Sequence, residues 1–168
     1  MRVIGLAGAS DDDRVALAVG VVSELTRRGF KVSVAQRASR GFDVDRPGKD
    51  SDRHRAAGAT EVMVTSANRW ALIHQRRPSS EARVADLTAH MSPADLLIAD
   101  GFVDEHHPCL ELHRSTTGTP RIHDGDSRIV AVASDIPLAG LGVPVFDLGD
   151  HPAIADFILG HCRLDGGQ

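Results

Sequence analysis

Short apolar runs alternate with segments of helical periodicity along the chain. The first apolar run covers residues 3–7, and apolar positions at helical spacing follow it until Gly29, a typical helix stop. Continuous apolar runs at 96–99 and 129–133 are typical of strands buried on both faces of a sheet. Because strands alternate with helices, we expect an α/β fold of three layers with a largely parallel sheet.

Weaker patterns predict the remaining elements. Two strand-like runs, 61–66 and 69–75, are separated by Ala67 and Asn68, so we expect a β-hairpin there. Asp150 is the expected N-cap of a last helix. The other expected elements are strands at 31–36, 110–114 and 143–148 and helices at 49–57, 82–91 and 151–161. Together they predict a single domain, 1–168.

The charge of the chain is mildly negative but unevenly distributed. The net charge is −4, so we expect no nucleic-acid partner, yet residues 27–55 hold nine Lys or Arg and only four Asp. Such a basic segment is typical of a binding site for a small anionic ligand. With two cysteines, no signal-peptide pattern and no apolar run of membrane-spanning length, we expect a cytoplasmic protein with no membrane partner.

The small-residue turn after the first apolar run, residues 8–10, has the position of a phosphate-binding loop. A working P-loop requires glycines, a Lys for the β- and γ-phosphates and a Ser or Thr for Mg²⁺. Here residues 11–13 are all Asp, Arg14 has the Lys position and Val15 has no oxygen for a metal. Three carboxylates repel a polyphosphate, so the residues alone favour an acidic first helical turn over nucleotide binding.

Two further places carry candidate chemistry. Asp100 ends a buried apolar run, as a Walker-B carboxylate that contacts Mg²⁺ or water would, although an Asp before Gly101 is also a common turn former. Residues 106–113 contain three His and Cys109, whose spacing does not match a zinc pattern. We therefore predict no metal site and an ordinary buried thiol at Cys109.

The most distinctive run is 41–59. It is dense in charge, poor in apolar residues and rich in glycine, as a ligand-contacting loop can be. An exposed charged helix is the alternative interpretation. The candidate ligand or cofactor residues of this run are Asp43, Asp45, Gly48, Lys49, Asp50, Ser51 and Arg53.

At this run the chain resembles the molybdopterin-guanine dinucleotide biosynthesis protein B (MobB) family. The resemblance spans nearly the whole chain and is most specific in the Gly-Lys-Asp-Ser sequence of residues 48–51. Further matching segments are 8–10, 25–34, 61–64, 69–72, 101–102, 107–108, 111–114 and 131–135.

The resemblance implies a P-loop NTPase-like fold with the hairpin as an extension. It also implies a homodimer that binds GTP and Mg²⁺ and has weak GTPase activity. The family assists a guanylyltransferase, MobA, in attaching a guanine nucleotide to the molybdenum cofactor. It is also associated with delivery of the cofactor to apo-enzymes.

The departures from the family cluster at the nucleotide site. The family's Gly-Ser-Gly-Lys-Thr-Thr is Asp-Asp-Asp-Arg-Val-Ala at residues 11–16, and the carboxylate of its Glu-Gly-Phe-Lys is the shorter Asp100. Loss of the Lys and of the Mg²⁺ hydroxyl removes phosphate stabilisation, while the run 41–59 is intact. The resemblance thus implies a degenerate nucleotide site at Gly8, Ser10, Asp13, Arg14, Val15, Asp100 and Gly101.

Three functions follow, in order of preference. The first is a MobB-like accessory protein of molybdenum cofactor maturation that serves as an adaptor or as a carrier of a molybdopterin-type cofactor. The second is a weak GTPase that uses Arg14 and Asp100 in altered roles. The third is a purely structural partner subunit of a molybdenum or tungsten enzyme system, which binds another protein and no small ligand. Whether the chain is an enzyme stays open between them.

Overall fold

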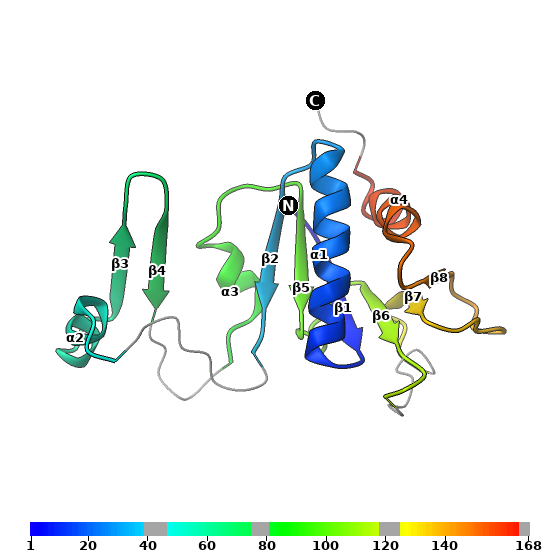
Figure 1. The fold of residues 1–168 in the computed structure, drawn as a ribbon, viewed down its shortest axis with the longest axis horizontal. Coiled ribbons are helices and arrows are strands. Elements are labelled where there is room, and N and C mark those ends of the chain that lie inside the picture. The colour runs from blue at the N-terminus through cyan, green and yellow to red at the C-terminus, as the bar shows by residue number, and fades with distance from the viewer. Residues whose placement is uncertain (39–46, 75–80, 118–124, 165–168) are drawn as a thin grey trace. The chain divides into compact units, whose positions relative to one another are not determined.

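The computed structural model describes residues 1–38, 47–74, 81–117 and 125–164. Contacts divide the chain into two compact units (Figure 1). The larger unit, which we call the sheet unit, consists of residues 1–39 and 83–168. The smaller one, which we call the hairpin unit, consists of residues 40–82.

A six-stranded sheet with the order β2-β5-β1-β6-β7-β8 forms the centre of the sheet unit. Each neighbouring pair of strands is parallel, so the expected parallel α/β sheet is confirmed. The strands are β1 (Arg2–Gly8), β2 (Val32–Gln36), β5 (Leu96–Asp100), β6 (Cys109–His113), β7 (Ile129–Ser134) and β8 (Val145–Asp147).

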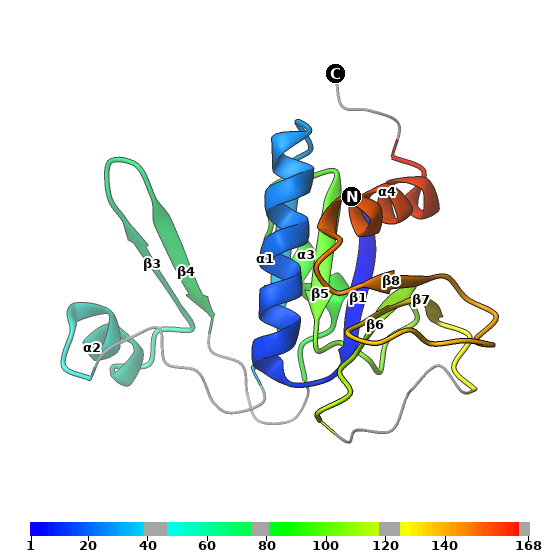
Figure 2. The same ribbon diagram turned by 45° about the vertical axis from the view of Figure 1, so that its right-hand side comes forward.

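Helices cover both faces of this sheet, which gives the expected three layers (Figure 2). Helices α1 (Asp11–Arg27) and α4 (His151–Cys162) pack on one face, where Leu25, Leu110 and Ile154 are fully buried. The short helix α3 (Val84–Thr88) packs on the other face against Leu97 and Phe102. Strand β5 is buried along its whole length, as its apolar run predicts.

The ends of the two long helices follow local sequence signals. Ser10 is the N-cap of α1, and its side chain accepts a hydrogen bond from the Asp13 N–H. Gly29, just past α1, has φ +93°, a conformation that suits glycine. Asp150 caps α4 by accepting from the Ala153 N–H, so the expected cap is confirmed.

Helix α3 is shorter than the expected helix at 82–91. It starts at Val84, whose N–H donates to the Glu105 carboxylate. After Thr88 the backbone N–H groups of His90 and Met91 bond to carbonyls three residues back, which tightens and ends the helix. The periodicity of the sequence continues through this turn, so the pattern alone predicts a longer helix.

The hairpin unit contains α2 (Asp50–Ala56), β3 (Glu61–Thr65) and β4 (Trp70–His74). The two strands pair antiparallel, with Thr65 opposite Trp70, so the expected hairpin is confirmed. Among the described residues of this unit only Val62 is buried. Three large apolar side chains on the strands are exposed, namely Met63, Val64 and Trp70.

Candidate functional site

The first candidate site lies at the carboxyl edge of the sheet, where β1 and β5 end side by side. Gly8 ends β1 with φ +79°, and a Cβ there would lie 2.4 Å from the Leu112 carbonyl oxygen. Gly101 follows β5 with φ +81°. Only glycine combines this backbone conformation with such a close approach, so the turn is tight and its shape is fixed.

The Arg14 side chain fills this turn. Its Nε donates to Asp100 Oδ1 at 2.6 Å, and its Nη2 donates to Asp11 Oδ1 at 2.6 Å. Its Nη1 donates to the carbonyl oxygens of Gly8 at 2.9 Å and Ala9 at 3.3 Å. Four of the five guanidinium N–H donors are thus satisfied within the protein.

The Arg14–Asp100 pair is largely removed from solvent, with the Asp100 side chain 2% and the Arg14 side chain 12% exposed. Burial alone lowers the pKa of Arg14, but the hydrogen bond and charge of Asp100, followed by those of Asp11, raise that pKa above its ordinary value. The guanidinium therefore stays charged, and its charge is neutralised locally by two carboxylates.

A second ion pair closes the same turn. Arg114, which follows β6, donates from Nε to Asp13 Oδ1 at 2.6 Å, and the Ser10 hydroxyl donates to Asp13 Oδ2 at 2.7 Å. The hydrogen bond from Ser10 and the charge of Arg114 hold the pKa of Asp13 below its ordinary value. The acidic first turn therefore does more than the expected helix capping, because two of its carboxylates pair with arginines.

GTP and Mg²⁺ are the ligands that the family resemblance implies at this turn. A phosphate-binding turn directs backbone N–H groups at an anion, whereas here the Gly8 and Ala9 carbonyls face a cation. Val15, at the Mg²⁺-ligand position, is 38% exposed and lines an apolar cavity of about 390 Å³ with Val19 and Val34. The turn thus brings together Gly8, Ser10, Asp13, Arg14 and Asp100 but holds them to one another.

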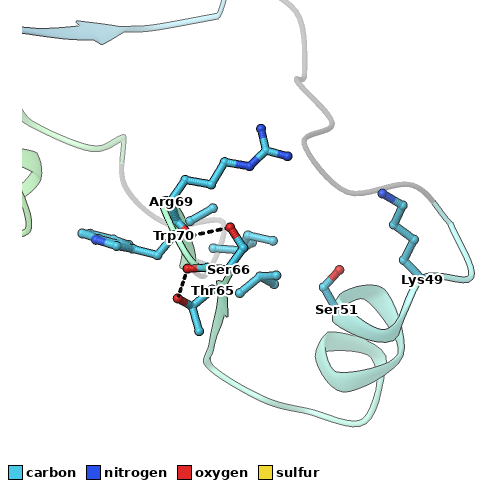
Figure 3. Close-up of a pocket in the computed structure, with 9 residues that line it drawn as sticks. Lys49, Ser51, Thr65, Ser66, Arg69 and Trp70 are labelled. Atoms are coloured by element: carbon cyan, nitrogen blue, oxygen red, sulfur yellow. Dashed lines mark hydrogen bonds between the residues drawn. The ribbon is translucent and has the colours of Figure 1, made fainter.

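The second candidate site lies in the hairpin unit and includes part of the predicted ligand loop (Figure 3). Lys49 and Ser51 line a cavity of about 400 Å³ together with Thr65, Ser66 and Arg69 of the hairpin. Of the other predicted loop residues, Gly48, Asp50 and Arg53 do not line this cavity, and Asp43 and Asp45 lie outside the described residues.

Residues 106–113 form no metal centre in the described part of the chain. No group of three His, Cys, Asp or Glu side chains gathers there or elsewhere within the described ranges. Cys109 is buried, as expected, and burial raises the pKa of its thiol to about 11. Burial also lowers the pKa of His107.

The charged residues of these sites that sequence reasoning did not single out include Asp11, Arg69 and Arg114. Asp11 pairs with Arg14, and Arg114 pairs with Asp13. Arg69 supplies a cation to the hairpin cavity. Arg114 is the last residue of the predicted strand 110–114 and so lies at the carboxyl edge of the sheet, which is the signal that could have indicated it.

Within the described ranges, no helix is both long enough and apolar enough to cross a membrane.

Residues 3–135 match the family model described as molybdopterin guanine dinucleotide synthesis protein B (MobB). Two curated relatives are both named molybdopterin-guanine dinucleotide biosynthesis adapter protein. The one from Escherichia coli (strain K12) is 32% identical over 98% of this chain and 95% of its own length. The one from Haemophilus influenzae is 31% identical over 93% of this chain and 86% of its own length.

Solved structures support the same fold. A crystal structure of molybdopterin-guanine biosynthesis protein B superposes with a TM-score of 0.76 at 23% identity, over 96% of this chain and 99% of that one. A MobB homologue from Bacillus stearothermophilus superposes with a TM-score of 0.70 at 24% identity, over 98% of this chain and 100% of that one. The P-loop NTPase-like fold with an additional hairpin is thereby confirmed.

Proposed function

Because the chain belongs to the MobB family of molybdopterin guanine dinucleotide synthesis proteins, we propose that it is an adapter in molybdopterin guanine dinucleotide biosynthesis that works without hydrolysing GTP at its first turn. One observation supports the absence of GTP hydrolysis in this proposal. The Arg14 guanidinium occupies the turn and is hydrogen-bonded to Asp100, Asp11 and two carbonyls. We further propose that residues 1–168 act as one domain.

Nucleotide binding at this turn would require the Arg14 side chain to leave. Its departure would leave Asp100 buried without a cationic partner, and breaking a buried pair in this way typically costs about 3–5 kcal/mol. The incoming phosphates would also meet the carboxylates of residues 11–13, which are anionic themselves. These two costs oppose GTP binding before any contact with the nucleotide is counted.

Native mass spectrometry and titration calorimetry of the freshly purified protein test this proposal. We expect no retained GTP, no Mg²⁺-dependent heat of binding at micromolar GTP, and no phosphate release. Micromolar binding with Mg²⁺-dependent turnover would contradict the proposal. In that case the Arg14→Ala variant tests the rival hypothesis, a weak GTPase that uses Arg14 and Asp100. Under that hypothesis the variant loses GTP turnover.

We propose that the adapter acts as a homodimer beside a MobA-like guanylyltransferase or a molybdenum or tungsten enzyme. The family resemblance and the name of the relatives support this proposal. Exposed apolar side chains in each unit, such as Val19 and Trp70, are typical of contact surfaces. The same native spectra measure the dimer mass, and a monomer at all protein concentrations would contradict the homodimer.

A further inference from the structure

Two cations of the hairpin unit have no carboxylate partner among the described residues. Lys49 precedes α2 and Arg69 precedes β4, and both side chains line the cavity of about 400 Å³. Figure 3 shows the charged ends of Lys49 and Arg69 extending toward the same opening from opposite sides, with the Ser51 hydroxyl directed into it from below.

The carboxylates of residues 47–74 are engaged elsewhere. Asp50 Oδ1 lies 3.7 Å from Arg53 Nη1, and Asp52 Oδ1 lies 3.2 Å from Arg55 Nη2. The other oxygen of Asp52 accepts a hydrogen bond from the Gly48 N–H. Glu61 bonds to His74 on the other strand of the hairpin. Within residues 47–74, therefore, no carboxylate pairs with either cation of the cavity.

The backbone positions of Lys49 and Arg69 are fixed by hydrogen bonds, although their side chains form no ion pair with the described residues. The Arg69 carbonyl accepts the Ser66 N–H at 2.8 Å and the Ser66 hydroxyl at 3.2 Å, which closes the hairpin turn. The Lys49 carbonyl accepts the Arg53 N–H at 3.0 Å and so starts α2. Two cations on fixed supports lose little conformational freedom of the backbone when they bind a shared anion.

One face of the hairpin supplies an apolar wall to the same cavity. Val64 is paired with Ala71, and Ile73 lies two residues further along β4, so the three side chains share one face. The Trp70 indole, from the next position, is directed away from Lys49 (Figure 3). The cavity thus combines the polar side chains of Lys49, Arg69 and Ser51 with the apolar wall of the hairpin.

We propose that this cavity binds a small organic phosphate, with Lys49 and Arg69 holding the phosphate group and the Val64–Ala71–Ile73 face contacting the apolar part of the molecule. Arg and Lys are suited to phosphate because charge-assisted hydrogen bonds to its oxygens are stronger than neutral ones. The proposal does not depend on the first turn, because every residue it uses belongs to the hairpin unit.

Titration of the intact protein with flavin mononucleotide and with riboflavin tests this proposal. The two molecules share a planar heterocycle, but only the first carries a phosphate monoester. We expect the mononucleotide to bind at least about tenfold more tightly at low salt and to weaken as the salt concentration rises, because the phosphate contacts are ionic. Inorganic pyrophosphate serves as a third probe that lacks the heterocycle.

Variants locate the binding. We expect Lys49→Ala and Arg69→Ala each to weaken mononucleotide binding about tenfold, and the double variant to abolish the preference over riboflavin. Lys49→Arg and Arg69→Lys keep the charges and retain most of the affinity. Lys31→Ala and Arg27→Ala remove exposed cations of the sheet unit and serve as matched controls with unchanged binding.

Two outcomes would overturn the proposal. One is mononucleotide binding that the double variant leaves unchanged, which would place the phosphate elsewhere on the protein. The other is equal or absent binding of mononucleotide and riboflavin at low salt. Neither outcome bears on GTP at the first turn, so failure here and failure of the proposed function are distinguishable.

Discussion

At the scale of single residues, the Arg14 side chain occupies the first turn and stabilises it as a bound ligand would. Its guanidinium satisfies Asp100 and Asp11 and the carbonyls that end β1, all within one side chain. Because Asp100 is almost fully buried, loss of Arg14 would leave a buried carboxylate without its cationic partner. Arg14 is therefore needed for the stability of the fold as well as for the electrostatics of the turn.

Arg14→Ala is expected to lower the free energy of unfolding by about 3–5 kcal/mol, because it leaves the buried Asp100 carboxylate without its cation. Urea denaturation followed by circular dichroism measures this change. Arg27→Ala removes a helix arginine that is 70% exposed and is expected to change stability by less than about 1 kcal/mol. Equal effects of the two substitutions would contradict the structural role of Arg14.

The sequence predicts which residues meet at this turn but not what they do to one another. Gly8, Arg14 and Asp100 follow or end strands that the apolar runs identify, and parallel strands end at a common edge. The inward direction of the guanidinium depends on the tight backbone at Gly8 and on Asp11, which no periodicity encodes. Arg114 was missed for the same reason, since its partner Asp13 is 101 residues away.

At the scale of elements, an ion pair between Arg28 and Asp156 joins the C-terminal end of α1 to α4. Glu24 accepts from Arg27 and Arg28 of its own helix region, and Arg28 also donates to Asp156 of α4. The hydrogen bond from Arg27, followed by that from Arg28, lowers the pKa of Glu24 to about 2 from an ordinary 4.5. The two helices therefore share a charge network on the same face of the sheet.

The contribution of Glu24 to stability is expected to depend on pH. Since folding lowers its pKa, the contribution is full above about pH 4.5 and is lost as the pH falls toward 2. The difference in unfolding free energy between the wild type and Glu24→Gln, measured by urea denaturation, should therefore shrink over this range. In an Arg27→Ala, Arg28→Ala background the difference should be small at every pH, and a persistent difference would point to another cause.

Elements with strong periodicity were predicted more reliably than those set by tertiary contacts. The hairpin, the long helices and the buried strands are present, because alternation and helical spacing specify them locally. Helix α3 is shorter than expected because its start depends on the Glu105 carboxylate, a distant residue. The edge strand β8 is present but covers only part of the expected run.

At the scale of the whole molecule, the two units differ in how much apolar surface they bury. All five residues of β5 are buried, whereas the described part of the hairpin unit has a single buried side chain, Val62. Two-stranded hairpins with little burial are marginally stable by themselves. Resistance to local opening is therefore expected to be concentrated in the sheet unit.

Hydrogen exchange measured by mass spectrometry tests this distribution. Amides of 61–74 are expected to exchange at least about tenfold faster than those of 96–100 in dilute protein, because fewer buried contacts oppose their opening. A dilution series distinguishes protection within one chain from protection that a second copy of the chain adds to the hairpin, because only the latter falls as the protein is diluted. Equal protection of the two segments at the lowest concentration would contradict the expectation.

The side chain that fills the first turn has a consequence for regulation. A turn completed by a dissociable ligand exists in two states, and their populations follow the ligand's concentration. A turn completed by a tethered arginine has one state wherever the chain is folded. Under the proposed function, the first turn thus carries no signal about the cell's guanine nucleotide supply, and the timing of the adapter's action is set by the arrival of its partners.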